Sequence, residues 1–375
     1  MKTFNVNVVR DPKVFEDNRL PAHSDHVVYA NKDECRYGYN SLRQSLNGVW
    51  RFRYSKNINE AKDGFWERDH DISGWDMIRV PAHIQMEGYG HPQYVNNQYP
   101  WDGSEYIKPG EIPERYNPVG DYALDFTVDR DWLNDRVCIS FQGVESGFAL
   151  WVNGSYVGYS EGSFDPAEFE LSPFLSEGVN RLAVRVFKVT SSSWCEDQDF
   201  FRFSGIYRDV YLYRMVKTYI TDISIVPALD ETLDSARLMI SGSAVGEGSV
   251  SFKLYEPVGD RGEYIRSVKE GYIEAGKEVI SDSVRINEGE LKGEYAISAP
   301  RLWSAEDPYL YILEMSVCDL QGNETSFIRQ LVGFRRFELK DGIMMLNGKR
   351  IVFNGVNRHE FNSDTGRVPD IGILE

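Results

Sequence analysis

The chain has 375 residues, of which 42% are hydrophobic and 26% are charged, and this composition is that of a folded globular protein rather than a disordered one. Its 41 Lys and Arg against 58 Asp and Glu give a formal net charge of -17. Nucleic acid and anionic membranes would be repelled on average, so neither is an expected partner. The length predicts two or three domains.

The N-terminal residues and the four cysteines predict the cellular compartment. The first 20 or so residues are charged throughout and lack the apolar core of a signal peptide, and no later run reaches the roughly 18 apolar residues of a membrane span. The cysteines are far apart in sequence, which excludes a CxxC motif and a disulfide scaffold. We therefore expect a cytoplasmic protein with buried or incidental thiols at Cys35, Cys138, Cys195 and Cys318.

The first part of the chain is a series of short alternating runs that predict β-strands rather than helices. Examples are residues 121–128, 136–141, 148–152 and 180–187. In the last of these, Leu182, Val184 and Val186 point to one face while Arg181 and Arg185 point to the other, as in a half-buried strand.

Two Asn-Gly pairs predict tight hairpins, because both residues accept the positive φ angles of a type I′ turn. They are Asn153-Gly154 and Asn347-Gly348. Many short strands at regular spacing are typical of a sandwich or barrel.

The residue composition and the pattern of alternation change near Val216 and again after Phe334. Seven of the eight tryptophans precede the first change. Residues 218–333 contain about seven alternating runs, which is the size of an immunoglobulin-like sandwich. After Phe334 comes a continuous apolar strand, Ile351 to Phe353, followed by polar residues.

Three polar segments are candidate sites. Residues 194–201 place Glu196, Asp197 and Asp199 between aromatics, which suits a sugar or, through oxygen ligands, a hard cation. The alternative is an acidic surface loop beside core aromatics. Residues 94–103 carry the adjacent amides Asn96 and Asn97, which suit hydroxyl recognition, and the alternative there is a turn-rich connection.

The third segment follows the apolar strand and contains Asn357, Arg358, His359 and Glu360. Polar groups at the C-terminal tip of a buried parallel strand are where barrel enzymes keep their sites. The alternative is a structural His-Glu pair at the surface. The remaining histidines have no metal-like spacing, and no nucleotide-binding or serine-hydrolase motif is present.

Runs between about residue 18 and 367 match a known family. They are NRLPAHS (18–24), SLNGVWRFRY (45–54), VPAHIQMEGYGHPQYVNNQYP (80–100), IPERYNPVGDYALDF (112–126), FQGVESGFALWVNGSYVGYSEGSF (141–164), GVNRLAVRV (178–186), EDQDFFRFSGIYRDVYL (196–212), RLWSAEDPYLY (301–311) and NGKRIVFNGVNRHEFNSDTGR (347–367). On these runs the chain resembles the N-terminal part of the large bacterial β-galactosidases of glycoside hydrolase family 2. We do not expect the EDQD and YVNNQYP segments together in related glucuronidases or mannosidases.

The resemblance implies an all-β fold in three parts: a jelly-roll sugar-binding domain over residues 1–217, an immunoglobulin-like sandwich over 218–333, and only the first strand of a (β/α)8 catalytic barrel over 334–375. It also implies that Asn96 and Asp199 reach the galactose subsite, and that Asp199 is one ligand of a sodium ion. His359 would contact a sugar hydroxyl and help stabilise the transition state. The implied substrate is a β-galactoside such as lactose, and family members are commonly multimeric.

A (β/α)8 barrel needs about 250 residues, and far fewer follow Phe334. The family's acid/base and nucleophile, and its magnesium ligands, lie on later barrel strands, so these 375 residues are expected to lack them. Glu360 takes neither role. We therefore expect an inactive chain whose residues from about 335 onward are poorly packed in isolation.

Three functions remain open at this point. The first is a β-galactosidase that acts with retention of configuration. The second is a non-catalytic subunit or assembly module that supplies sugar-contacting loops to a barrel on another chain. The third is a weak carbohydrate-binding protein. Turnover by the chain alone, turnover only with a barrel-bearing partner, and galactose binding without turnover distinguish them.

Overall fold

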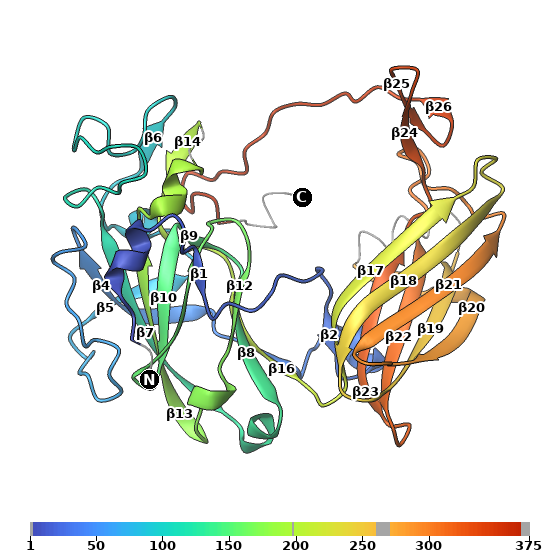
Figure 1. The fold of residues 1–375 in the computed structure, drawn as a ribbon, viewed down its shortest axis with the longest axis horizontal. Helices are drawn as coiled ribbons and strands as arrows, with labels where there is room; N and C mark the ends of the chain where they lie inside the picture. Colours follow the sequence, from blue (N-terminus) through green and yellow to red (C-terminus); the bar gives the residue numbers. More distant parts are fainter. Residues whose placement is uncertain (1–2, 197–198, 260–270, 369–375) are drawn as a thin grey trace. The chain divides into compact units, whose positions relative to one another are not determined.

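The computed structural model describes residues 3–196, 199–259 and 271–368, and its regular structure is almost entirely β (Figure 1). The described residues form two compact units. Unit 1 comprises the residues up to Ala22, Arg43–Arg214 and the residues from Arg358 onward. Unit 2 comprises His23–Leu42 and Met215–Asn357.

Unit 1 contains two larger sheets. The seven-stranded sheet is antiparallel, in the order β1 (Glu16–Asp17), β11 (Ser155–Glu161), β10 (Gly147–Val152), β13 (Gly178–Phe187), β7 (Val119–Val128), β4 (Gly48–Ser55) and β5 (Asp76–Val80). The four-stranded sheet has the order β12 (Ala167–Glu170), β8 (Arg136–Phe141), β16 (Val210–Met215) and β3 (Arg43–Ser45).

The core of unit 1 lies between these two sheets. Inward residues of both sheets form one apolar cluster, which includes Trp50, Phe52, Tyr122, Leu150 and Val184 from the first sheet and Ile139, Phe141, Phe169, Val210 and Leu212 from the second. Burying one such side chain contributes roughly 1.5–3 kcal/mol. Two sheets packed over a shared core are a β-sandwich, as the sequence predicted.

A second, aromatic-rich cluster covers the other face of the seven-stranded sheet and explains why aromatic residues are so frequent. It includes Phe65, Trp101, Trp151, Tyr159 and Phe187. The predicted alternation of 180–187 is confirmed, because Leu182, Val184 and Val186 lie in the core between the sheets, but the prediction of a half-buried strand was wrong, because both faces are covered. Arg185 is buried under these loops, and its guanidinium donates to Asp121 at 2.7 Å and to Asp63 at 2.9 Å.

The two predicted hairpins are present. Asn153 and Gly154 have φ angles of 51° and 85° and join β10 to β11. Asn347 and Gly348 have φ angles of 50° and 73° and join two strands of a small three-stranded sheet. In both cases the chain reverses at the residues whose backbone accepts positive φ.

Short elements connect the strands of unit 1. Two ribbons of paired strands are β6 (Gln93–Val95) with β14 (Phe200–Arg202), and β9 (Val144–Glu145) with β15 (Gly205–Ile206). The 3-10 helices are η1 (Val6–Arg10), η2 (Ile84–Glu87), η3 (Arg130–Asn134), η4 (Ser172–Phe174) and η5 (Ser191–Trp194).

Unit 2 is built from two further antiparallel sheets. One has the order β17 (Tyr219–Leu229), β18 (Ser235–Val245) and β21 (Glu290–Ser298). The other has the order β2 (Val28–Tyr29), β23 (Glu324–Val332), β22 (Tyr311–Asp319), β19 (Gly248–Pro257) and β20 (Ala275–Arg285). The seven strands β17 to β23 agree with the number expected for an immunoglobulin-like sandwich.

Residues 23–42 join unit 2 although they precede most of unit 1 in the sequence. Val28 in β2 pairs with Ile328 in β23, and the α-helix α1 (Lys32–Tyr37) follows. Asn31 caps α1 by accepting from the Glu34 amide at 3.0 Å. In the part of the chain that the structure describes, no helix is long and apolar enough to cross a membrane.

The residues after the sandwich form a small meander of β24 (Phe337–Lys340), β25 (Ile343–Leu346) and β26 (Lys349–Arg350). The strand predicted at Ile351 to Phe353 does not form: β26 ends at Arg350, the Ile351 amide donates to the Met344 carbonyl of β25 at 3.0 Å, and the residues from 352 to 361 are irregular. A barrel strand is held by neighbouring strands on both sides. No strand among the described residues pairs with this segment, and Val352 and Phe353 are exposed.

Candidate functional site

The ribbon of β6 and β14 brings together the two polar loops singled out in the sequence. Its register pairs Val95 with Phe200, so Asn96 directly follows one strand and Asp199 directly precedes the other at the same end of the ribbon (Figure 1). Both side chains are exposed. The predicted sugar-facing amide and carboxylate therefore lie next to each other, although more than 100 residues separate them in sequence.

Asp199 also has a specific neighbour on the opposite strand. The hydroxyl of Tyr94 donates a hydrogen bond to the carboxylate of Asp199. This hydrogen bond raises the pKa of Tyr94, because it favours the protonated phenol. The result is an exposed cluster of hydroxyl, carboxylate and amide groups, which are the groups that bind sugar hydroxyls.

Buried aromatic residues anchor the loops behind this cluster. The ring of Trp101, which is 1% exposed, stacks on Tyr99 with centroids 4.9 Å apart and lies 5.0 Å from Trp194. The indole of Trp194 donates to the Glu111 carbonyl at 2.7 Å. The base of the loop is therefore packed against buried aromatic rings.

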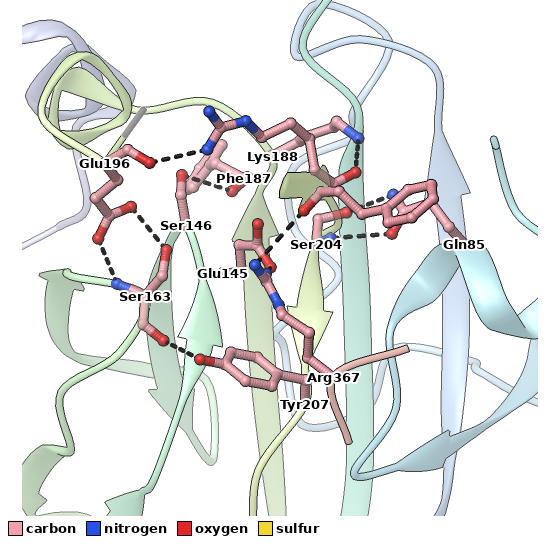
Figure 2. Close-up of polar contacts among 12 residues, drawn as sticks. Gln85, Glu145, Ser146, Ser163, Phe187, Lys188, Glu196, Ser204, Tyr207 and Arg367 are labelled. Atoms are coloured by element: carbon pink, nitrogen blue, oxygen red, sulfur yellow. Dashed lines mark hydrogen bonds and ion pairs between the residues drawn. The ribbon is translucent and has the colours of Figure 1, made fainter. Parts of the chain in front are cut away.

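The acidic run of residues 196–199 divides into an inward and an outward part. Both carboxylate oxygens of Glu196 accept from Ser163, one from the amide and one from the hydroxyl, each at 2.7 Å (Figure 2). Burial raises the pKa of Glu196. Glu196 therefore holds its loop to Ser163, and Asp199 points outward. Asp197 lies outside the described residues.

The third predicted segment, residues 357–360, is connected to the same ribbon through the residue that follows it. His359 is exposed, and its neighbours Arg358 and Glu360 form an ion pair at 3.0 Å. The ring of Phe361, two residues later, stacks on Phe201 of β14 with centroids 5.0 Å apart and planes 11° from parallel. The structure therefore ties the His359 segment to the strand that Asp199 precedes.

A buried polar network beneath the ribbon was not predicted from the sequence (Figure 2). Arg367 forms an ion pair with Glu145, and Lys188 donates to the Arg202 carbonyl at 3.2 Å. Burial lowers the pKa of Lys188 to about 8, although Glu145 opposes this shift. The network connects the segment after His359 with the sheets of unit 1.

A partly open cavity of about 30 Å³ adjoins the network. Polar side chains that line it include Glu145, Ser146, Lys188 and Ser163. A void of this size is enough for one or two water molecules but too small for a sugar. The cavity therefore lies among the buried residues and not at Asn96 or Asp199.

A buried histidine lies beside the network. His83 is fully buried, and its ring is sandwiched between Phe203 at 4.3 Å and Tyr207 at 4.9 Å. Among the described residues neither ring nitrogen of His83 has a hydrogen-bond partner. Burial, and then the positive charges of Arg367 and Lys188, hold the pKa of His83 well below its ordinary value.

Asp199 is the residue at which a sodium ion was predicted. Sodium prefers several oxygen ligands, and within residues 3–196, 199–259 and 271–368 no group of three or more His, Cys, Asp or Glu side chains is arranged to hold an ion. Asp199 supplies one carboxylate, next to the phenol of Tyr94. Sodium at Asp199 therefore stays a prediction, as does magnesium, and no chemical step is derived through either ion.

Three family models match consecutive parts of the chain. The sugar binding domain of the glycosyl hydrolases family 2 matches residues 43–216, the family 2 domain that follows it matches residues 218–335, and the TIM barrel domain of the same family matches residues 337–375. The fold and these matches define a protein with two β-sandwiches followed by the start of a barrel domain. The chain belongs to glycosyl hydrolase family 2.

Relatives and solved structures agree with this family. The chain is 46% identical over 370 residues to a beta-galactosidase of Halalkalibacterium halodurans, covering 98% of this chain and 35% of the relative. It is 38% identical over 375 residues to a beta-galactosidase large subunit of Latilactobacillus sakei, covering 97% of this chain and 57% of the relative. The chain thus spans between about a third and three fifths of these relatives.

A crystal structure of a beta-glycosidase from Bacteroides vulgatus has a similar fold. Its TM-score is 0.65 at 24% identity, and the match covers 88% of this chain and 39% of that one. This likeness supports the arrangement of strands in the two sandwiches.

Proposed function

We propose that residues 1–375 are the sugar-binding part of a β-galactosidase, an enzyme that removes terminal β-D-galactose from β-D-galactosides such as lactose with retention of configuration. The names of the relatives support the substrate class. One structural observation carries the proposal: a single ribbon places Asn96 beside Asp199, and Phe361 fastens the His359 segment to the same ribbon.

The three residues have complementary roles in this proposal. The Asn96 amide donates to one sugar hydroxyl and accepts from another, and the Asp199 carboxylate accepts from hydroxyls. His359 contacts a hydroxyl and helps to stabilise the transition state. A retaining glycosidase also needs two carboxylates about 5–5.5 Å apart, which in this proposal come from barrel strands other than the one that begins in residues 337–375.

The polypeptide of residues 1–375 is therefore proposed to be inactive alone and active when the rest of a family 2 barrel is supplied. Turnover of a chromogenic β-galactoside should be undetectable for the purified chain. It should appear when a separately produced polypeptide carrying the remaining barrel of a relative is added. Turnover at an ordinary enzymatic rate by the chain alone would overturn this part of the proposal.

Point variants test the site within the reconstituted enzyme. Asp199→Asn, Asn96→Ala and His359→Phe should each lower kcat/KM by at least tenfold. The matched controls Asp165→Asn and Asn134→Ala change exposed side chains outside the proposed contacts and should stay within twofold. Equal losses in the variants and their controls would contradict the assignment of these residues.

A second candidate is a non-catalytic subunit that completes a barrel on another chain. The observation that favours it is the exposure of apolar side chains at Phe337, Leu339, Val352, Phe353 and Val356, within or next to the start of the barrel. Some relatives are named large subunits. This function also predicts turnover only when a barrel-bearing polypeptide is present. Tight association of the two separate chains in the absence of substrate, measured by co-sedimentation, would favour it over the first function.

A further inference from the structure

Arg367 occupies an aromatic cage on unit 1. Its guanidinium lies 4.4 Å from the ring centroid of Phe200 and between 5.6 and 5.7 Å from the rings of Phe164, Phe203 and Tyr207. Arginine is suited to such a cage because its planar cation stacks on aromatic faces. The cage residues belong to the sugar-binding domain, whereas Arg367 belongs to the start of the barrel domain.

The cage also contains the counter-charge for Arg367. Glu145 forms an ion pair with it, and the side chains of Arg367 and Glu145 are 15% and 8% exposed (Figure 2). A buried guanidinium needs such a partner, because an unpaired charge away from water is strongly disfavoured. Arg367 is therefore held by charge and by aromatic contact together.

The residues before Arg367 form a closed turn that packs tightly on unit 1. Asn362 and Gly366 exchange two backbone hydrogen bonds, each at 2.8 Å. Gly366 has a φ of +67°, and a Cβ atom there would lie 2.7 Å from the Cδ2 atom of His83. Only glycine allows this approach without displacing the buried ring.

The turn therefore has an anchor on each side. On one side Phe361 stacks on Phe201, and on the other Arg367 fills the cage. His359 precedes Phe361 by two residues, as Asp199 precedes Phe201 by two. An anchored turn limits how far His359 can move relative to Asp199.

We propose that Arg367 is a positioning residue that holds the His359 segment against the β6–β14 ribbon, so that the first barrel loop is fixed by the sugar-binding domain. Arg367 itself does not touch the sugar. The effect of Arg367 on catalysis rests on the proposed function. Its effect on how firmly the His359 segment is held does not.

Hydrogen exchange on the chain of residues 1–375 tests the structural half. Arg367→Met should speed exchange of the Asn362 and Gly366 amides at least tenfold, and Glu145→Gln should do the same from the other side of the ion pair. Arg367→Lys, which keeps the charge but not the planar cation, should lie between Arg367→Met and the parent chain. The control Arg358→Met removes an exposed ion pair of the same segment and should leave both amides unchanged.

Two results of this experiment would overturn the proposal. Unchanged exchange in Arg367→Met, with unit 1 folded by circular dichroism, overturns the proposal. Faster exchange throughout unit 1 also overturns it, because Arg367 would then support the sandwich rather than the turn.

The reconstituted enzyme tests the catalytic half. Arg367→Met should lower kcat/KM about tenfold when His359 is present, and by less than twofold in the His359→Phe background, because it acts through His359. Equal losses in both backgrounds would contradict this route. If reconstitution gives no turnover with any variant, the proposed function fails, and the exchange result still decides whether Arg367 anchors the turn.

Discussion

The described residues that match the barrel domain fall into two segments with opposite environments. The hairpin segment, Phe337–Val356, leaves five apolar side chains more than half exposed. The docked segment, Phe361–Val368, stacks one ring on β14 and inserts one guanidinium into a buried cage. Both segments are short and contain little regular structure, so local propensity does not explain the difference.

The difference shows where each segment finds its packing partners. The docked segment contacts residues of the sugar-binding domain that already form a complete sandwich. Among the described residues, the strands of the hairpin segment pair only with one another, in the meander of β24, β25 and β26, and the Asn347 amide donates to the Trp303 carbonyl at 3.0 Å. A barrel strand depends on its neighbours, and none of the described residues takes their place. The described start of the barrel is thus packed where the preceding domain supplies a surface.

The largest effect is expected at Phe203, on which the docked segment packs. Phe203 is 1% exposed and packs against His83 and Arg367. Phe203→Ala should lower the free energy of unfolding of unit 1 by about 3–5 kcal/mol, because it empties a packed site. Urea denaturation followed by tryptophan fluorescence is suitable, since seven of the eight tryptophans lie in unit 1.

The matched control for this variant is Phe15→Ala, which removes an exposed ring of the same unit. It should change the free energy of unfolding by less than about 0.5 kcal/mol. A similar loss of unfolding free energy in both variants would show that Phe203 does not occupy a packed site.

Much of the fold was predictable because it depends on local patterns. The hairpins follow from Asn-Gly pairs, and the strand at 136–141 agrees with β8 residue for residue. The burial of Arg185 was not predictable, because alternation within a strand does not show that a second aromatic layer covers its outer face. The same limitation applies to the excursion of residues 23–42 into unit 2.

The site was predictable in its exposed part and not in its support. Asn96 and Asp199 stand out as polar residues among aromatics, and a single strand register brings them together. Glu145, Lys188 and Arg367 gave no comparable indication. Their partners are far apart in sequence, and the members of the Glu145–Arg367 pair are 222 positions apart. The only available hint was a lysine that directly follows the apolar strand at 180–187.

A smaller effect should appear in acid and should depend on His83. The pKa of His83 in the folded chain lies well below that of the unfolded chain. As the pH falls below about 6.5, the unfolded chain binds a proton that the folded chain does not, so stability is lost. Between pH 6.5 and 5.5 the free energy of unfolding of unit 1 should fall by about 1 kcal/mol from this residue alone.

His83→Phe removes the titrating group and keeps a flat ring between Phe203 and Tyr207. Urea titrations from pH 5.5 to 8 should show that the variant loses about 1 kcal/mol less than the parent chain on acidification. Above pH 7 the two proteins should differ by a constant. The same acid loss in both would mean that His83 is not the group that is protonated.

The smallest effect is expected in the hairpin segment and completes the comparison. Phe353 and Val356 are largely exposed, so Phe353→Ser with Val356→Ser should change the free energy of unfolding of unit 2 by less than about 0.5 kcal/mol. Phe334→Ser, at a fully buried ring 5.1 Å from Tyr311, is the matched opposite case and should cost at least about 3 kcal/mol. Because exposed apolar side chains promote association, the double variant should also sediment with less self-association than the parent chain. A loss above 1 kcal/mol in the double variant would mean that these residues are already packed, and the contrast between the two segments would not hold.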